Sequence, residues 1–151
     1  GKKIESSDKK FILEYRKKIG VILQNDYLIP FFTVYENIEL ASEIQNNKSN
    51  FKSRMKQILD WLGLKQIENT MIDKLSKGEK QKVVIARALI NNPKIIIADQ
   101  PENFLDQNTV RKVFFLFESL NKQGTTIIIT SNLEKIITVN YKTINLDQSE
   151  R

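Results

Sequence analysis

The residue best placed to do chemistry in this sequence is Asp99, which ends the apolar run Ile95-Ile96-Ile97-Ala98. A short, continuously apolar and β-branched run predicts a parallel strand that helices cover on both faces. Ligands of open α/β sheets bind at the carboxyl ends of such strands. A carboxylate in this place therefore predicts a site for a hydrated metal ion beside phosphates.

The composition restricts the available chemistry to carboxylates, amides, hydroxyls and amines. The 151 residues include no cysteine and no histidine, which excludes disulfides, thiolate chemistry and imidazole catalysis. The length predicts one domain, and 40% hydrophobic with 28% charged residues is ordinary for a globular chain. No apolar run approaches the roughly 20 residues of a membrane-spanning helix, so a cytosolic protein is expected.

The net charge of +6 raises the question of a nucleic-acid partner, because clustered lysines release counterions from phosphates. The lysines are instead scattered in short pairs such as Lys17-Lys18, and a few surround residues 76 to 79. This distribution favours a solvated surface over a dedicated nucleic-acid site. The group around residues 76 to 79 could help to bind a nucleotide phosphate.

Local signals predict the elements that position Asp99. Ser76 with Glu79 has the spacing of a capping box, so a helix is expected from Ser76 until Asn91-Asn92-Pro93 stops it. Thr33 with Glu36 predicts a second capped helix, through about residue 44. Helical spacing followed by a C-terminal glycine predicts a third helix, formed by Phe51, Met55, Ile58, Leu59, Leu62 and Gly63.

Further strands and helices alternate along the chain. Residues 19 to 23 predict a buried strand that ends at Gln24, and residues 125 to 130 predict another after a helix that Gly124 stops. A short helix at 133 to 137 and a last strand at 141 to 146 are also expected. The whole pattern predicts an α/β sheet with a helical insertion.

These segments together resemble the ATPase domain of ATP-binding cassette (ABC) proteins. LSKGE followed by KQKVVIARAL is similar to the signature motif and its helix, and IIIADQP is similar to the Walker B strand. Leu23-Gln24 resembles the Q-loop, Phe104-Leu105-Asp106 the D-loop, and Thr130-Ser131-Asn132 the loop of the switch histidine. The segments IADQPENFLD and LIPFFTVYENIEL are most similar to the lipoprotein-release, macrolide-export and cell-division subgroup of exporter ATPases.

The resemblance implies a P-loop NTPase-like α/β fold with a partial parallel sheet and a helical subdomain insertion. No G-x-x-x-x-G-K-[ST] run occurs in the 151 residues, so we expect a truncated domain that lacks the amino-terminal P-loop strand. The helical and signature subdomain is expected at about 30–92, with the α/β core at about 11–29 and 93–151. With that strand expected beside Walker B, residues 95 to 99 are expected to have an unpaired edge. The chain is then expected either to self-associate through this edge or to be a portion of a larger folded protein.

The family also implies a role for each motif. ATP and Mg²⁺ are the expected ligands of a complete domain, with the metal at Asp99 and Gln24. The remaining nucleotide contacts are expected from Ser76, Lys77, Gly78, Glu79 and Asp106, with residues 76 to 79 serving the nucleotide of the opposite protomer. A second ABC ATPase domain, identical or different, and a transmembrane permease subunit are the implied partners, at the inner face of the cell membrane. The stretch from 27 to 32 would border the groove that receives the permease.

Several positions depart from the family. Gln100 stands where a glutamate polarises the attacking water, and an amide cannot accept that proton. Ser131 replaces the switch histidine, while Lys77 and Glu79 replace a glycine and a glutamine of the signature. Loss of a general base typically costs about 10²- to 10⁴-fold in rate, so the chain is expected to be catalytically inactive. Gln100 alone would also fit an engineered trap, and natural divergence fits the other changes.

Three functions follow from these observations. The first is the ATP-binding subunit, or a fragment of one, of an ABC transporter that couples ATP to export or membrane-protein remodelling. The second is a non-catalytic, cassette-like regulatory module. The third is a nucleic-acid- or ribosome-associated ABC protein, which the scattered lysines support least. Although the family is one of ATPases, hydrolysis by this chain stays open.

Overall fold

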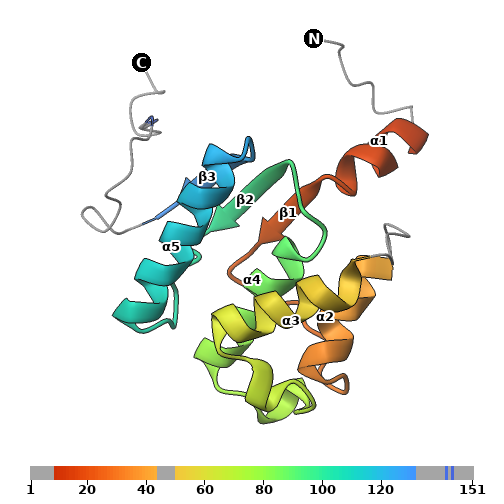
Figure 1. Ribbon diagram of the computed structural model, residues 1–151, viewed down its shortest axis with the longest axis vertical. Coiled ribbons are helices and arrows are strands. Elements are labelled where there is room, and N and C mark those ends of the chain that lie inside the picture. Colours follow the sequence, from red (N-terminus) through yellow and green to blue (C-terminus); the bar gives the residue numbers. More distant parts are fainter. Residues whose placement is uncertain (1–8, 44–49, 132–141, 143, 145–151) are drawn as a thin grey trace.

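A computed structural model describes residues 9–43, 50–131, 142 and 144 (Figure 1). Strands and helices alternate along the chain, and two further helices lie between the first two strands. In chain order the elements are α1 (Lys9–Arg16), β1 (Ile19–Ile22), α2 (Val34–Glu43), α3 (Phe51–Leu62), η1 (Lys65–Ile67), η2 (Ile72–Lys74), α4 (Lys77–Leu89), β2 (Ile95–Asp99), α5 (Gln107–Lys122) and β3 (Thr126–Thr130).

The three strands form one parallel sheet in the order β1-β2-β3. The register places Val21 beside Ile97 and Ile97 beside Ile128. Strand β2 is therefore paired along both edges, and the expectation of an unpaired edge at residues 95 to 99 was wrong. That expectation depended on an assumed strand order, which the local sequence does not specify. The free edges within the described chain belong to β1 and β3.

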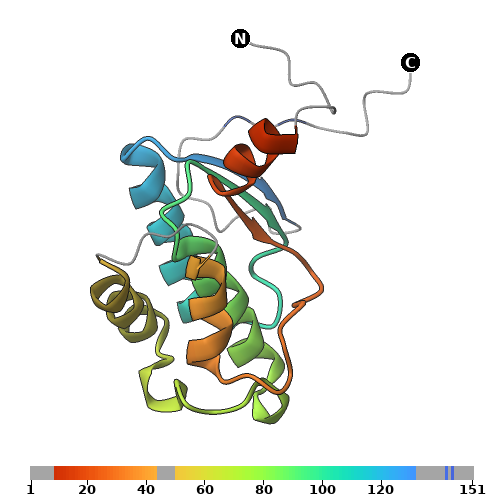
Figure 2. The same cartoon turned by 90° about the vertical axis from the view of Figure 1, so that its right-hand side faces the viewer.

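One face of the sheet packs on α4 and α5, as Figure 2 shows. Ile22, Ile96 and Ala98 are buried there in one core with residues of both helices. Gly20 lets α4 come closest, because a Cβ at this position would lie 2.5 Å from the backbone oxygen of Ala88. The close approach explains why a glycine interrupts an otherwise β-branched strand.

No described element covers the other face of the sheet. One row of apolar side chains crosses all three strands there, with Val21 43%, Ile97 40% and Ile128 54% exposed. The prediction that both faces of the Asp99 strand are covered is therefore wrong for the described part of the chain. A continuously apolar strand can be buried on both faces, but its sequence does not show which elements lie against those faces.

The helical insertion begins with the predicted capping box. The Thr33 amide donates to Glu36 Oε2 at 2.7 Å, and the Glu36 amide donates to Thr33 Oγ1 at 3.2 Å. Helix α3 ends at Gly63, whose φ of +69° is the left-handed conformation predicted for a C-terminal glycine. The buried Asn37 side chain bonds both backbone groups of Ile29, which fixes the loop before α2.

Two predicted elements cannot be compared with the structure. The short helix expected at 133 to 137 and most of the strand expected at 141 to 146 lie outside the described residues. The subdomain boundaries stay a prediction. Within the described residues, no helix is both long enough and apolar enough to cross a membrane.

The open face and the free edge of β3 predict self-association of the purified chain. Exposed apolar strands pair readily with other chains, so we expect light scattering to detect species larger than the monomer. Ile128→Lys, which places a charge on the open face, should shift the distribution toward monomer. Phe115→Lys introduces the same charge at an exposed site on α5 and should not. A monomeric parent protein, or equal effects of both variants, would contradict this.

Candidate functional site

Four predicted site residues meet at the carboxyl edge of the sheet. The register aligns Ile22, Ala98 and Ile129 across the strands, so the residues after each strand lie along one edge. Gln24 follows β1, Asp99 ends β2 with Gln100 directly after it, and Ser131 follows β3. The structure thus brings together the groups that the sequence assigned to the metal ion and the attacking water.

Asp99 supplies the carboxylate of this edge. The hydroxyl of Thr130, its register partner on β3, donates a hydrogen bond to Asp99 Oδ1. Carboxylate, hydroxyl and the amide oxygen of Gln24 are hard oxygen donors of the type that suits Mg²⁺. Within the described residues, no group of three or more acidic side chains could hold a metal ion. These oxygen donors are of the type that would hold a hydrated Mg²⁺ ion.

Gln100 is held in a fixed orientation. Its φ of +47° is uncommon for a residue with a side chain, and its backbone amide donates to the Thr130 oxygen at 2.9 Å. Its side-chain oxygen accepts a hydrogen bond from Asn103 Nδ2 at 2.9 Å. The amide group can orient a water molecule but cannot take a proton from it.

The carboxylate of Glu102, which was not predicted as a site residue, lies next to Ser131, at the predicted position of the switch histidine. Ser131 Oγ donates to Glu102 Oε1 at 2.6 Å. The other oxygen, Glu102 Oε2, is buried and has no hydrogen-bond partner in the described structure. The two residues are 29 positions apart, so no local sequence signal indicates this pair.

The predicted helix start at Ser76 is confirmed. Ser76 is the N-cap of α4, and both halves of the capping box form. The Ser76 hydroxyl and amide donate to Glu79 Oε2 at 2.6 and 2.8 Å. These hydrogen bonds lower the pKa of the Glu79 carboxyl, the side-chain bond most. The Glu79 charge thus points into the capping box.

The start of α4 lies against the segment that follows β2. A Cβ on Gly78 would lie 2.8 Å from the backbone oxygen of Phe104, so only glycine permits this approach. Lys77 Nζ lies 5.2 Å from the centroid of the Phe104 ring, a cation–π distance. The buried Gln81 side chain donates to the Pro101 oxygen at 3.2 Å. Residues 76 to 79 are thereby held next to the sheet edge, although they do not belong to it.

Asp106 lies at the end of the same segment and begins α5. Its side chain accepts from the backbone amides of Asn108 and Thr109, both at 3.0 Å, and from the Thr109 hydroxyl. The hydrogen bonds to Thr109 are the main cause of the lowered pKa of the Asp106 carboxyl. In this conformation Asp106 acts as a helix cap.

Arg87 joins α4 to the chain after Gln24, a contact that the sequence analysis missed. Its guanidinium donates to the backbone oxygens of Asp26 and Tyr27 at 2.7 and 2.8 Å. Burial lowers the pKa of Arg87, and Asp26 opposes this shift. The position of a charged residue within the apolar stretch Val83–Leu89 was the only signal in the sequence.

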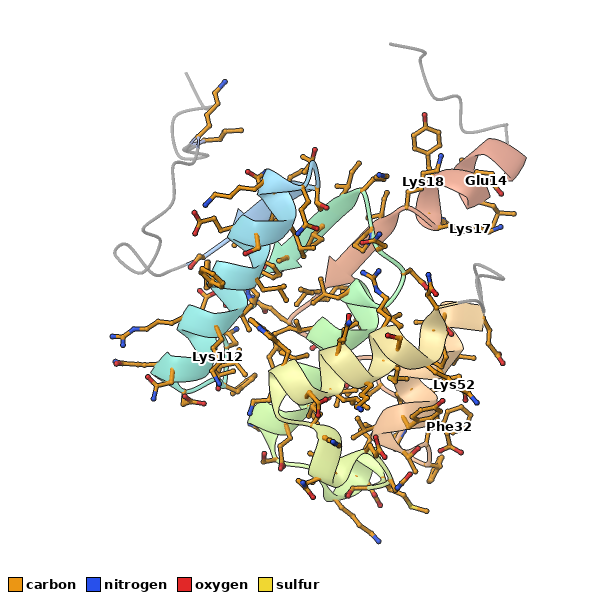
Figure 3. All side chains as sticks on the ribbon, in the orientation of Figure 1. Glu14, Lys17, Lys18, Phe32, Lys52 and Lys112 are labelled. Atoms are coloured by element: carbon orange, nitrogen blue, oxygen red, sulfur yellow. The ribbon has the colours of Figure 1, made fainter. Side chains whose placement is uncertain are left out.

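A cavity of about 330 Å³ opens beside Arg87. It runs beside β1, and we call it the β1 groove. Its lining includes Arg16, Lys17, Val21, Leu23, Tyr27 and Arg87. Figure 3 shows Phe32 on the helical insertion, near Lys52 and apart from Lys17. Of the stretch from 27 to 32, only Tyr27 lines the groove.

Comparison with known proteins decides the family. A family model described as ABC transporter matches residues 1–103. The chain belongs to the ABC transporter family. Within this family, Asp99 and Gln24 at the sheet edge keep their predicted parts as Walker B and Q-loop residues, and the predicted signature lies at the start of α4.

Relatives and solved structures agree with this assignment. The chain is 40% identical over 141 residues to the cell division ATP-binding protein FtsE of Streptococcus pneumoniae, covering 92% of the chain and 61% of FtsE. It is 34% identical to the methionine import ATP-binding protein MetN of Clostridioides difficile, covering 90% of the chain and 43% of MetN. The ABC cassette MJ0796 bound to ADP and Pi superimposes with a TM-score of 0.78 at 33% identity, covering 88% and 60%. The chain thus spans about three fifths or less of these ABC proteins.

The ABC signature contributes to stability through its capping box. Ser76→Ala should lower the free energy of unfolding by about 1 kcal/mol, measured by urea denaturation. Ser53→Ala, at an exposed site on α3, is the matched control.

The pKa of the Glu79 carboxyl is lowered from 4.5 in the folded state. The contribution of Glu79 to the free energy of unfolding is therefore present above pH 4.5 and disappears as the pH falls through the pKa of the folded state. Glu79→Gln should reduce that acid-dependent loss, and an unchanged pH profile would contradict the assignment.

Proposed function

We propose that this chain is the part of an ABC transporter's ATP-binding subunit that carries the Q-loop, signature, Walker B and D-loop segments. The observation that supports this most is the alignment of Gln24, Asp99, Gln100 and Ser131 at one sheet edge, with the signature helix held beside it. The complete subunit would couple ATP binding to export or to remodelling of a membrane protein. Its similarity to FtsE supports the cell-division-like subgroup.

Each residue has a distinct part in this proposal. Asp99 and Gln24 would hold hydrated Mg²⁺, which neutralises charge on the phosphates when it is bound. The hydroxyl of Thr130 orients Asp99. The start of α4, with Lys77 and the amides near Gly78, would face the nucleotide of a second cassette.

The fixed amide of Gln100 suggests that this protein binds nucleotide without efficient hydrolysis. Its oxygen is occupied by Asn103, and the Ser131 hydroxyl is directed to Glu102. Neither group can act as the general base of phosphoryl transfer. These contacts favour, as the second candidate, a non-catalytic cassette that regulates a transporter.

The proposed partners are a second ABC ATPase domain and a transmembrane permease subunit. MJ0796 has been solved as a dimer, which supports the first. The β1 groove supports the second, since it is concave and lies beside Tyr27, next to the Q-loop segment. With these partners the subunit would lie on the cytoplasmic face of the cell membrane.

The 151-residue chain is expected neither to hydrolyse ATP nor to bind it tightly. It contains no G-x-x-x-x-G-K-[ST] run, and phosphoryl transfer depends on positioning and charge stabilisation. Phosphate release with magnesium ATP is the measurement. Turnover at ordinary cassette rates that Asp99→Ala abolishes, and that Asp73→Ala at an exposed site leaves intact, would contradict this expectation.

Joined to a phosphate-binding segment, the chain should regain hydrolysis when the base is restored. Gln100→Glu should raise the rate by about 10²-fold or more and exceed the effect of Ser131→His. The double variant should be the fastest, with effects that do not add, because both groups act on one transition state. Gln107→Glu, at an exposed position of α5, makes the same chemical change away from the edge. If none of the variants raises the rate of hydrolysis, another residue activates the water.

A further inference from the structure

Glu102 is a carboxylate near the sheet edge that the proposed function does not use. Its Oε1 accepts a hydrogen bond from the Ser131 hydroxyl at 2.6 Å, the short distance of a charge-assisted O–H donor. Its Oε2 is buried and has no hydrogen-bond partner within the described part of the chain. Among the described side chains, Ser131 is therefore the one donor that this carboxylate has.

The contact between Glu102 and Ser131 lies next to the contact that holds Asp99. Thr130 and Ser131 follow each other at the end of β3. The hydroxyl of Thr130 donates to Asp99, and the hydroxyl of Ser131 donates to Glu102. Two neighbouring hydroxyls thus bond two carboxylates of the segment around the end of β2. The Ser131 hydroxyl therefore connects the sheet edge to a second carboxylate.

We propose that Glu102 is the final proton acceptor of a water–Ser131–Glu102 relay that supports slow hydrolysis of a nucleoside triphosphate. This inference rests on the proposed function, which supplies the nucleotide at the sheet edge. Ser131 alone is not a base. A hydroxyl that donates to a carboxylate can nevertheless accept a proton from water while it passes its own proton on. The proton acceptor is then two residues beyond Gln100, the predicted position of the base.

Each proton and electron pair of this step has a destination. The oxygen of the attacking water forms a bond to the terminal phosphorus. The bond between that phosphorus and the bridging oxygen breaks, and its electron pair stays on the diphosphate. One water proton passes to Ser131 Oγ while the hydroxyl proton of Ser131 passes to Glu102 Oε1. Glu102 then releases the proton to solvent, so the side chains return to their starting state beside a nucleoside diphosphate and inorganic phosphate.

Gln100 can orient the water for this relay. Its side-chain oxygen is occupied by Asn103 Nδ2 at 2.9 Å, so the group that it offers to a water is the donor Nε2. A water that accepts a hydrogen bond from Nε2 directs its own hydrogens to other acceptors. The Ser131 hydroxyl oxygen is such an acceptor at the same sheet edge. The amide thus positions the water, and the hydroxyl removes its proton.

The relay predicts hydrolysis that is slow and not absent. A proton that travels through an intervening hydroxyl requires two aligned transfers, whereas a carboxylate at position 100 would take it directly. The higher rate expected for Gln100→Glu is therefore compatible with a relay through Ser131.

The first experiment tests the contact itself in the 151-residue chain, without nucleotide. The side-chain carboxyl carbon of Glu102 is followed by carbon-detected NMR. Ser131→Ala should shift this resonance, because the carboxylate loses its hydrogen bond. Ser53→Ala, at an exposed site on α3, should leave the resonance where it is. A resonance that Ser131→Ala does not move would overturn the proposal.

The second experiment measures single-turnover hydrolysis of magnesium ATP by the complete ATP-binding subunit. Glu102→Gln should lower the rate by about 10²-fold without weakening ATP binding, which calorimetric titration measures. Ser131→Ala should lower the rate to a similar extent, because either change interrupts the same relay. Ser131→Thr keeps the hydroxyl and should retain most of the rate. Glu43→Gln, at an exposed position of α2, should leave the rate unchanged.

The solvent isotope effect separates a proton relay from a hydrogen bond that only holds two segments together. In mixtures of H2O and D2O, the rates of the parent subunit and of Ser131→Thr should depend on the deuterium fraction with the curvature of two transferred protons. A linear dependence, a rate that Glu102→Gln leaves unchanged, or no hydrolysis by a subunit that binds ATP would overturn the relay alone. A complete subunit that does not bind ATP would contradict the proposed function as well as the relay.

Discussion

The packing of α4 against the segment after β2 is the contact on which the site depends. With no side chain at Gly78, the helix start comes within van der Waals contact of the Phe104 backbone. Gln81 adds a buried hydrogen bond to Pro101 four residues after the start of the helix. A side chain at position 78 would separate the signature from the sheet edge, and the two halves of the site would no longer share a fixed geometry.

Of the two edge positions that depart from the family pattern, 100 and 131, the second is in contact with a carboxylate. Gln100 stands at the predicted position of the base and Ser131 at the predicted position of the switch histidine, and the serine is bonded to Glu102. The carboxylate is therefore still present near the edge, two residues further along the chain. Because Glu102 Oε2 is buried without a partner among the described residues, this oxygen is a poorly solvated acceptor.

Local sequence signals predicted local structure well. Both capping boxes, the glycine that ends α3 and the position of each strand along the chain are set by residues within a few positions of one another. Clustering of the edge residues also followed, because parallel strands end on the same side. Strand order and the open sheet face were missed, since these depend on which segments are neighbours. The contacts of Glu102 and Arg87 join residues 29 and about 60 positions apart, so no periodicity indicates them.

Helix α4 is tied to its surroundings along its whole length. Phe104 contacts its first turn, Arg87 connects its last turns to the chain after β1, and Arg54 of α3 donates to the Leu89 oxygen at its end. Thirteen residues at 1.5 Å each give a rod about 20 Å long. A stiff rod converts a small tilt into a displacement that grows with distance from the pivot. If the helix tilted by about 10° about a pivot at Arg87, Ser76 would move by about 3 Å, which is the length of a hydrogen bond. A small tilt at the Arg87 end of the helix is therefore enough to make or break contacts at its Ser76 end.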